Sequence, residues 1–152
     1  MPRVYISSEK TRAVIERAQN RCEYCQSPVE YATDTFAVDH IKPVSRGGAN
    51  GLENLALACT GCNGRKYNKQ EAPDLVSGEL VSLYNPRRQN WKEHFCWSED
   101  YGRIVGLTPT GRATVEALQL NRTGVVNIRK VLFLIDKHPP VIQFIQSEPG
   151  ES

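Results

Sequence analysis

The sequence lacks any apolar run long enough to cross a membrane. Spanning a bilayer takes about 20 consecutive apolar residues, and no run of that length occurs among these 152 residues. The opening Met-Pro-Arg-Val-Tyr also lacks the charged-then-apolar pattern of a signal peptide. We therefore expect a cytoplasmic protein that makes no contact with a membrane.

An excess of charge of one sign is also missing. Nineteen Lys and Arg residues face 17 Asp and Glu residues, which gives a net charge of only +2. Any attraction to nucleic acid must therefore come from the local placement of basic residues. The sequence shows no internal repeat and no low-complexity tract, and its apolar and charged fractions are those of a globular protein. We expect one folded domain, or a small module with an appended segment.

Four of the five cysteines form two Cys-x-x-Cys pairs, namely Cys22, Cys25, Cys59 and Cys62. In a reducing compartment such pairs indicate a metal site more than disulfides. Each pair can deliver two thiolates from one tight turn, and four thiolates complete the tetrahedral shell of a structural zinc ion. Chance placement or a redox dithiol are the alternatives, but neither pair lies beside a βαβ pattern of the thioredoxin kind. Cys96 we interpret as a packing residue.

The segment between the two cysteine pairs contains adjacent Asp39 and His40, in a chain with three histidines. If the zinc site holds them near Asn63, the Asp39 carboxylate and the Asn63 amide oxygen are hard ligands suited to Mg²⁺ or Mn²⁺. His40 is then the natural general base toward an attacking water, and the Asn54 carbonyl could fix its tautomer. One ion, one base and one orienting group suffice for phosphodiester hydrolysis.

The pattern of residues 1–72 predicts the order helix, knuckle, strand, loop, strand, helix. A helix start is expected at residues 7–10, strands at 36–41 and 55–58, and a polar helix from Cys59 onward. Neighbouring residues of a regular strand point to opposite faces. Bringing Asp39 and His40 to one site therefore requires a strand end or a bulge there, and Pro43 is consistent with pairing that ends nearby.

A set of residues in this region resembles the motif of the HNH endonucleases in their zinc-bound form, over about residues 21–69. The set is Asp39-His40-Ile41, Pro43, Ser45, Gly47-Gly48, Asn54-Leu55, Cys59-x-x-Cys62-Asn63 and Lys66. The resemblance implies the ββα-metal fold, a hairpin followed by a helix with a divalent ion between them. It also implies that Asp39 and Asn63 bind this ion, that His40 is the general base and that Asn54 is the middle Asn. Many members end the motif with His where this chain has Asn63, which also offers a hard oxygen.

Basic residues surround the proposed site and are expected to contact the phosphates of double-stranded DNA. They are Lys42, Arg46, Arg65, Lys66 and Lys69; a solvated surface position is the alternative for each. A second basic group, Arg87-Arg88 with Lys92, flanks Trp91. Trp91 could stack on a base, although packing in the core is the favoured interpretation. We expect His94 and His138 both to be structural.

Linker-like residues at 71–78 lead us to place a boundary near residue 72. Residues 1–72 would form the zinc-stapled module, with its core at 21–69. Residues 73–152 would form a small α+β extension, for which the sequence suggests no chemistry. In this extension we expect two strands around a turn at 99–102 and helices at 110–120 and 125–137.

Taken together, the sequence predicts an α+β endonuclease that hydrolyses DNA with a structural zinc ion and a catalytic Mg²⁺ or Mn²⁺. Two other functions fit parts of the pattern. A catalytically weak, zinc-stabilised DNA-binding module would need the four cysteines but not Asp39, His40 and Asn63 together. A zinc-knuckle protein-interaction domain would have no affinity for nucleic acid. The joint presence of the three residues favours the enzyme.

Overall fold

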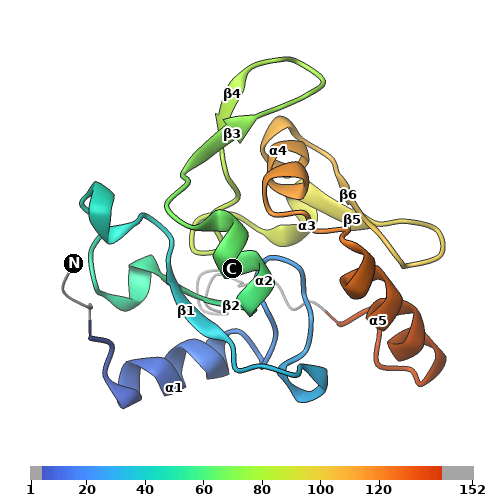
Figure 1. Cartoon of the computed structure of the whole chain (residues 1–152), viewed down its shortest axis with the longest axis horizontal. Helices are drawn as coiled ribbons and strands as arrows, with labels where there is room; N and C mark the ends of the chain where they lie inside the picture. The colour runs from blue at the N-terminus through green and yellow to red at the C-terminus, as the bar shows by residue number, and fades with distance from the viewer. Residues whose placement is uncertain (1–4, 142–152) are drawn as a thin grey trace, which may run out of the picture.

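The computed structural model of the protein describes residues 5–141 and has a mixed α+β fold (Figure 1). Three two-stranded antiparallel sheets alternate with short helices. In chain order the elements are α1 (Ser8–Arg17), β1 (Ala37–His40), β2 (Leu55–Ala58), α2 (Thr60–Lys66), β3 (Glu71–Pro73), β4 (Leu80–Ser82), α3 (Trp91–His94), β5 (Phe95–Trp97), β6 (Ile104–Gly106), α4 (Pro109–Ala117) and α5 (Thr123–Leu134). Within residues 5–141, no helix is long and apolar enough to cross a membrane.

Helix α1 begins where the sequence predicts it. The Ser7 side chain caps the helix by accepting a hydrogen bond from the Lys10 backbone N–H at 3.2 Å. Val14, the buried residue of α1, packs with Leu55 and Leu57 of β2. The helix therefore covers the hairpin that carries the Asp-His pair.

Strands β1 and β2 form a regular antiparallel hairpin. Asp39 lies opposite Ala56 and His40 opposite Leu55, without a bulge. All four residues of β2 are buried, which confirms the strand predicted at 55–58. Strand β1 is one residue shorter at each end than the strand predicted at 36–41. It is regular through Asp39 and His40, so neither a strand end nor a bulge between them brings their side chains to one face.

Helix α2 follows the hairpin directly and packs against both of its strands. The Cys59 side chain caps it by accepting from the Cys62 backbone N–H. A hairpin followed by a helix is the ββα arrangement that the sequence predicted. In Figure 1 this unit occupies the left and centre of the molecule.

The segment expected to be a linker is a second hairpin, β3–β4, which projects at the top of Figure 1. The Asp74 side chain fixes its turn by accepting from the backbone N–H groups of Val76 and Ser77 and from the Ser77 hydroxyl. Arg112 of α4 clamps the same carboxylate with two bonds of 2.9 and 3.0 Å. Asp, Ser and Gly serve tight turns as well as linkers, which explains why composition suggested a linker. The boundary proposed near residue 72 falls inside β3.

The C-terminal elements follow the sequence in most respects. Strands β5 and β6 pair around the expected turn, and α4 and α5 lie within three residues of the predicted ranges at each end. Residues 91–94, expected to begin a strand, form one helical turn instead. The part of the predicted extension beyond residue 141 lies outside the described residues.

One hydrophobic core joins the two halves of the chain. Tyr24 and Cys62 from the first half pack in the same cluster as Tyr84, Trp91 and Phe95 from the second. Trp91 is 4% exposed, and its Nε1 donates to the Tyr24 carbonyl oxygen at 3.0 Å. The core interpretation of Trp91 is therefore confirmed. The second half completes the interior of the first.

Substitution of Phe95 tests this shared core. Phe95 is 1% exposed, so Phe95→Ala should lower the free energy of unfolding by about 3–5 kcal/mol. Leu134→Ala removes a side chain that is 81% exposed and serves as the control, with an expected change within about 0.5 kcal/mol. Urea unfolding measures both. Equal stabilities for the two variants would contradict a common core.

Candidate functional site

The four cysteines of the two Cys-x-x-Cys pairs lie together in the interior. Their sulfur atoms all fall within 4.8 Å of one another, and the sulfurs of Cys25 and Cys59 are 3.7 Å apart. A tetrahedral zinc ion with bonds of about 2.3 Å spaces its sulfurs by about 3.8 Å, so the cluster has the size that zinc needs. In each pair the second cysteine's backbone N–H donates to the first sulfur at 3.5 Å. The predicted cluster of Cys22, Cys25, Cys59 and Cys62 is confirmed, and it could hold zinc.

A guanidinium group from the second half of the chain contacts this cluster. Arg122 precedes α5 and donates to the sulfurs of Cys59 and Cys62, at 3.3 and 3.6 Å. A Cβ atom on Gly61 would lie 2.6 Å from Arg122 Nη2, so glycine permits this approach. Zinc with four thiolates carries a net charge of about −2, and a cation beside two of the sulfurs stabilises such a site.

A second arginine binds the other cysteine pair. Arg129 of α5 is 2% exposed, and its Nη2 donates to the carbonyl oxygens of Cys25 and Leu120 at 3.3 and 2.8 Å. Burial lowers the pKa of Arg129 to about 10, so it is still a cation at neutral pH. Arg122 and Arg129 therefore contact both cysteine pairs, so the C-terminal half helps to surround the four-cysteine cluster.

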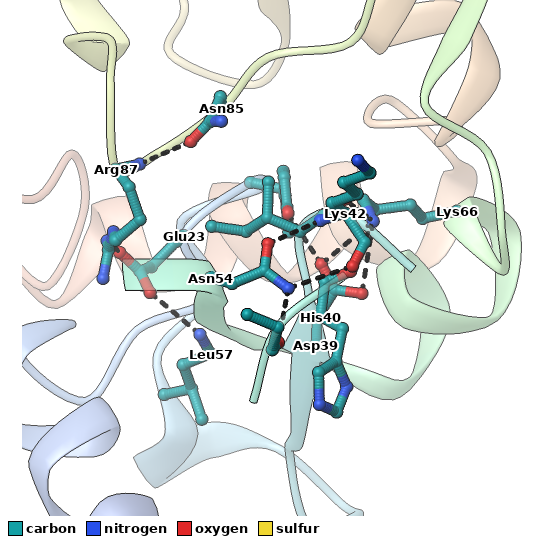
Figure 2. Close-up of polar contacts among 12 residues, drawn as sticks. Glu23, Asp39, His40, Lys42, Asn54, Leu57, Lys66, Asn85 and Arg87 are labelled. Carbon is teal, nitrogen blue, oxygen red and sulfur yellow. Dashed lines mark hydrogen bonds and ion pairs between the residues drawn. The ribbon is translucent and has the colours of Figure 1, made fainter. Parts of the chain in front are cut away.

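The Asp39 carboxylate is buried and already engaged (Figure 2). It accepts a hydrogen bond from the Tyr24 hydroxyl at 2.8 Å and forms an ion pair with Lys66 Nζ at 3.2 Å. The same ammonium group donates to the carbonyl oxygens of His40 and Ile41 at 3.2 and 3.0 Å. Lys66 thereby ties the end of β1 to the last turn of α2.

Burial and charge act in opposite directions on this group. Removal from water raises the pKa of the Asp39 carboxyl and prevails over Lys66 and the Tyr24 hydroxyl, which both lower it. Burial, followed by the charge of Asp39, raises the pKa of Tyr24 well above its usual value, so Tyr24 stays a protonated donor. Lys66 differs from the sequence expectation: at 1% exposed it cannot reach a phosphate on the surface. A buried carboxylate needs a partner, and Lys66 is that partner.

His40 leaves β1 on the face opposite Asp39, because the strand is regular through both residues. In Figure 2 its ring points away from Lys66. The imidazole is half-buried. The two side chains therefore flank the end of the strand and do not share one of its faces.

Asn50 sets the tautomer of His40. Its Oδ1 lies 2.9 Å from His40 Nε2, and its Nδ2 donates to the Tyr5 carbonyl oxygen at 3.0 Å. Since a carbonyl oxygen only accepts, the amide nitrogen must face Tyr5 and the amide oxygen must face the ring. Nε2 then carries the proton, and Nδ1 keeps a lone pair. In the neutral form of this ring, Nδ1 is the nitrogen that could accept a proton as a general base.

Asn54, expected to orient the imidazole, closes the loop between the strands instead (Figure 2). Its Oδ1 accepts from the Lys42 backbone N–H at 2.8 Å, and its Nδ2 donates to the carbonyl oxygens of Lys42 and Ala49 at 3.0 and 2.7 Å. The same loop needs Gly48, where a Cβ atom would lie 1.8 Å from the Lys42 carbonyl oxygen. Asn54 therefore positions the loop. The contact with the His40 ring, which the sequence analysis expected from Asn54, is made by Asn50.

Asn63 is half-buried in α2. Among residues 5–141 its side-chain amide has no hydrogen-bond partner, so the amide oxygen is available to a ligand. Residues three apart share a face of a helix, which places Asn63 on the face of Lys66, the residue that contacts Asp39. Asp39 and Asn63 therefore belong to elements that pack together.

The other basic residues expected at the nucleic-acid surface are exposed. They are Lys42, Arg46, Arg65 and Lys69. Arg65 Nη1 donates to the Gly61 carbonyl oxygen at 3.2 Å, and Lys69 Nζ donates to the Arg65 carbonyl oxygen at 2.8 Å. These contacts neutralise no charge, so all four cations remain available for phosphates.

Three residues that the sequence patterns did not single out complete the site. Tyr24 sits between two zinc ligands, where an aromatic residue signals burial. Asn50 follows the glycine pair of the loop, and a polar side chain there was a usable signal. Arg122 offers no local signal, because 60 positions separate it from Cys62.

Comparison with known families agrees with this geometry. Residues 22–69 match the family model described as HNH endonuclease. The match begins at Cys22 and includes both cysteine pairs, the β1–β2 hairpin and α2. No curated protein and no solved structure matches the chain. The match of residues 22–69 to the HNH family model confirms, for this segment, the resemblance seen in the sequence.

The zinc centre predicts an effect for a residue distant in sequence. Arg122→Gln removes the cation beside Cys59 and Cys62, so zinc affinity should fall about 10–100-fold. Cys59→Ser, which removes a ligand, should abolish stoichiometric zinc and lower stability. Elemental analysis after competition with a chelator measures both. Arg103→Gln changes the charge equally at an exposed position and should keep zinc like the parent; equal retention by Arg122→Gln would contradict the role of Arg122.

The buried ion pair predicts a large effect on stability. Lys66→Met leaves the Asp39 carboxylate without its cation and should cost about 3–5 kcal/mol in the free energy of unfolding. Lys69→Met, at an exposed position just beyond α2, should change it by less than about 0.5 kcal/mol. Adding Asp39→Asn to Lys66→Met should restore most of the loss. A double variant as unstable as the sum of both single variants would exclude the pairing.

Proposed function

We propose that the HNH domain hydrolyses phosphodiester bonds of double-stranded DNA with a divalent metal ion. His40 serves as the general base toward the attacking water, and Asp39 with Asn63 holds Mg²⁺ or Mn²⁺. Such an ion, when bound, polarises the phosphate and stabilises the leaving oxygen. The four-cysteine cluster holds a structural zinc ion, and the cytoplasm is the compartment we propose.

The observation that carries the proposal is the state of the His40 ring. Asn50 accepts the Nε2 proton at 2.9 Å, so the Nδ1 lone pair is free to take a proton from water. The ring stands where β1 ends, next in sequence to a carboxylate.

The proposed ion position requires a change at Lys66. Its ammonium group now supplies the positive charge beside Asp39, at 3.2 Å. A divalent ion on the same carboxylate would meet that ammonium group, and like charges repel at this distance. We therefore propose that ion binding displaces Lys66 from Asp39, while the free amide oxygen of Asn63 provides the second protein ligand.

A second function is favoured by the same ion pair. If the ion pair between Lys66 and Asp39 persists, the domain binds DNA through its exposed cations but holds no catalytic ion. This is the catalytically weak, zinc-stabilised DNA-binding module. The two functions differ in one measurable property, which is cleavage of DNA in the presence of Mg²⁺ or Mn²⁺.

Substitution of His40 tests the proposed mechanism. Supercoiled plasmid incubated with the parent and Mg²⁺ or Mn²⁺ should be nicked, and EDTA should stop the reaction. His40→Ala should abolish nicking but retain zinc, folding and DNA binding, because the base acts mainly in the transition state. His94→Ala, purified identically, should keep activity and so excludes a contaminating nuclease.

Loss of an ion ligand should produce a different response. Asn63→Ala should also lose activity, and excess Mn²⁺ should restore part of it, whereas His40→Ala should not respond. Asp39→Ala is a poorer probe because it leaves Lys66 buried without an anion. Nicking by His40→Ala at the parental rate would refute the mechanism, and a parent that binds DNA but never nicks it would support the binding module.

A further inference from the structure

A groove of about 830 Å³ is lined by both halves of the chain. The HNH half supplies Lys42, Asn54 and Lys66, and the C-terminal half supplies residues 82–85 together with 88–89. Figure 2 draws these two regions around Asn54. Lys66 lines the groove, and its ammonium group is 3.2 Å from the Asp39 carboxylate, so the groove borders the partner of the candidate catalytic carboxylate.

Three exposed cations from separate parts of the chain line this groove, namely Lys42, Lys69 and Arg88. Among the described residues, the side chains of Lys42 and Arg88 have no hydrogen-bond or ion-pair partner. Two carboxylates, Glu53 and Glu71, also line it. Neither forms an ion pair with the three cations in the part of the chain that the structure describes. Among the described residues, the charges of Lys42, Lys69 and Arg88 are therefore not neutralised by a carboxylate.

Arg87 and Arg88 are neighbours with different environments. Arg87 forms a buried ion pair with Glu23 and donates to the Leu55 carbonyl oxygen at 3.3 Å. Arg88 is exposed and faces the groove. The first arginine fastens this turn to the HNH half, which leaves the second free to contact a ligand.

The turn that carries Arg88 is held by its own polar groups. Asn85 Oδ1 accepts from the Arg87 backbone N–H at 2.9 Å, and the Asn85 backbone N–H donates to Gln89 Oε1 at 2.9 Å. The Tyr84 hydroxyl donates to the Gln89 carbonyl oxygen at 3.3 Å. Arg88 therefore starts from a fixed backbone, which reduces the entropy lost when it binds.

We propose that this groove binds the sugar–phosphate backbone of the DNA substrate and that Arg88, from the C-terminal half, is one of its phosphate contacts. Lys42 and Lys69 contact the same backbone from the HNH half. This inference rests on the proposed function, because it takes the occupant of a groove beside Asp39 to be the substrate. It gives Arg88, which the sequence placed only in a second basic group near Trp91, a specific phosphate contact in the groove.

The salt dependence of DNA binding tests the inference. Each phosphate contact that is lost should flatten the slope of log affinity against log salt by about one unit. In a His40→Ala background, which prevents cleavage, Arg88→Ala should show this change and weaken binding to unrelated duplexes alike. Arg88→Lys should retain most of the slope. Arg103→Ala removes the same charge from an exposed position outside the groove lining and should leave the slope unchanged.

The possible outcomes separate this inference from the proposed function. If the parent nicks plasmid but Arg88→Ala and Arg103→Ala bind with the same slope, the groove inference is overturned and the nuclease assignment stands. If Arg88→Ala flattens the slope but the parent never nicks, the groove inference is supported and the nuclease assignment fails. A parent without affinity for DNA at low salt overturns both.

Discussion

The ion pair between Asp39 and Lys66 is the contact on which the candidate site is built. A carboxylate that is 4% exposed has to be paired, and here its partners are the Lys66 ammonium group and the Tyr24 hydroxyl. Tyr24 lies between two zinc ligands and receives a hydrogen bond from Trp91 through its carbonyl oxygen. One buried cluster thus links the four cysteines, the candidate catalytic carboxylate and the C-terminal core.

The C-terminal half consequently contributes contacts to the core, the four-cysteine cluster and the groove. It completes the hydrophobic core through Trp91, places Arg122 against the sulfurs of Cys59 and Cys62, and lines the groove with Arg88. Each of these contacts joins elements that are far apart in the sequence. The HNH segment alone would expose its core and lose a counter-charge at the zinc centre.

Local patterns predicted the parts of the structure that depend on neighbouring residues. The cysteine pairs follow from their spacing, and the strand at 55–58 follows from a short, continuous apolar run. Lys66 was predicted to be an exposed phosphate contact, because a lysine on a polar helix is typical of the surface. Its buried partner, Asp39, is 27 positions away in the sequence. The orienting Asn was assigned to Asn54 when it is Asn50, since type and spacing cannot say which of two amides faces a ring.

The account depends most on whether a divalent ion binds between Asp39 and Asn63 and displaces Lys66. Titration of the zinc-loaded protein with Mn²⁺, followed by amide NMR, measures this directly, because the paramagnetic ion broadens the resonances nearest to it. We expect the amides of Asp39, His40 and Asn63 to broaden first. Broadening that begins elsewhere, for example at Glu53, or no selective broadening at all, would contradict the proposed ion site.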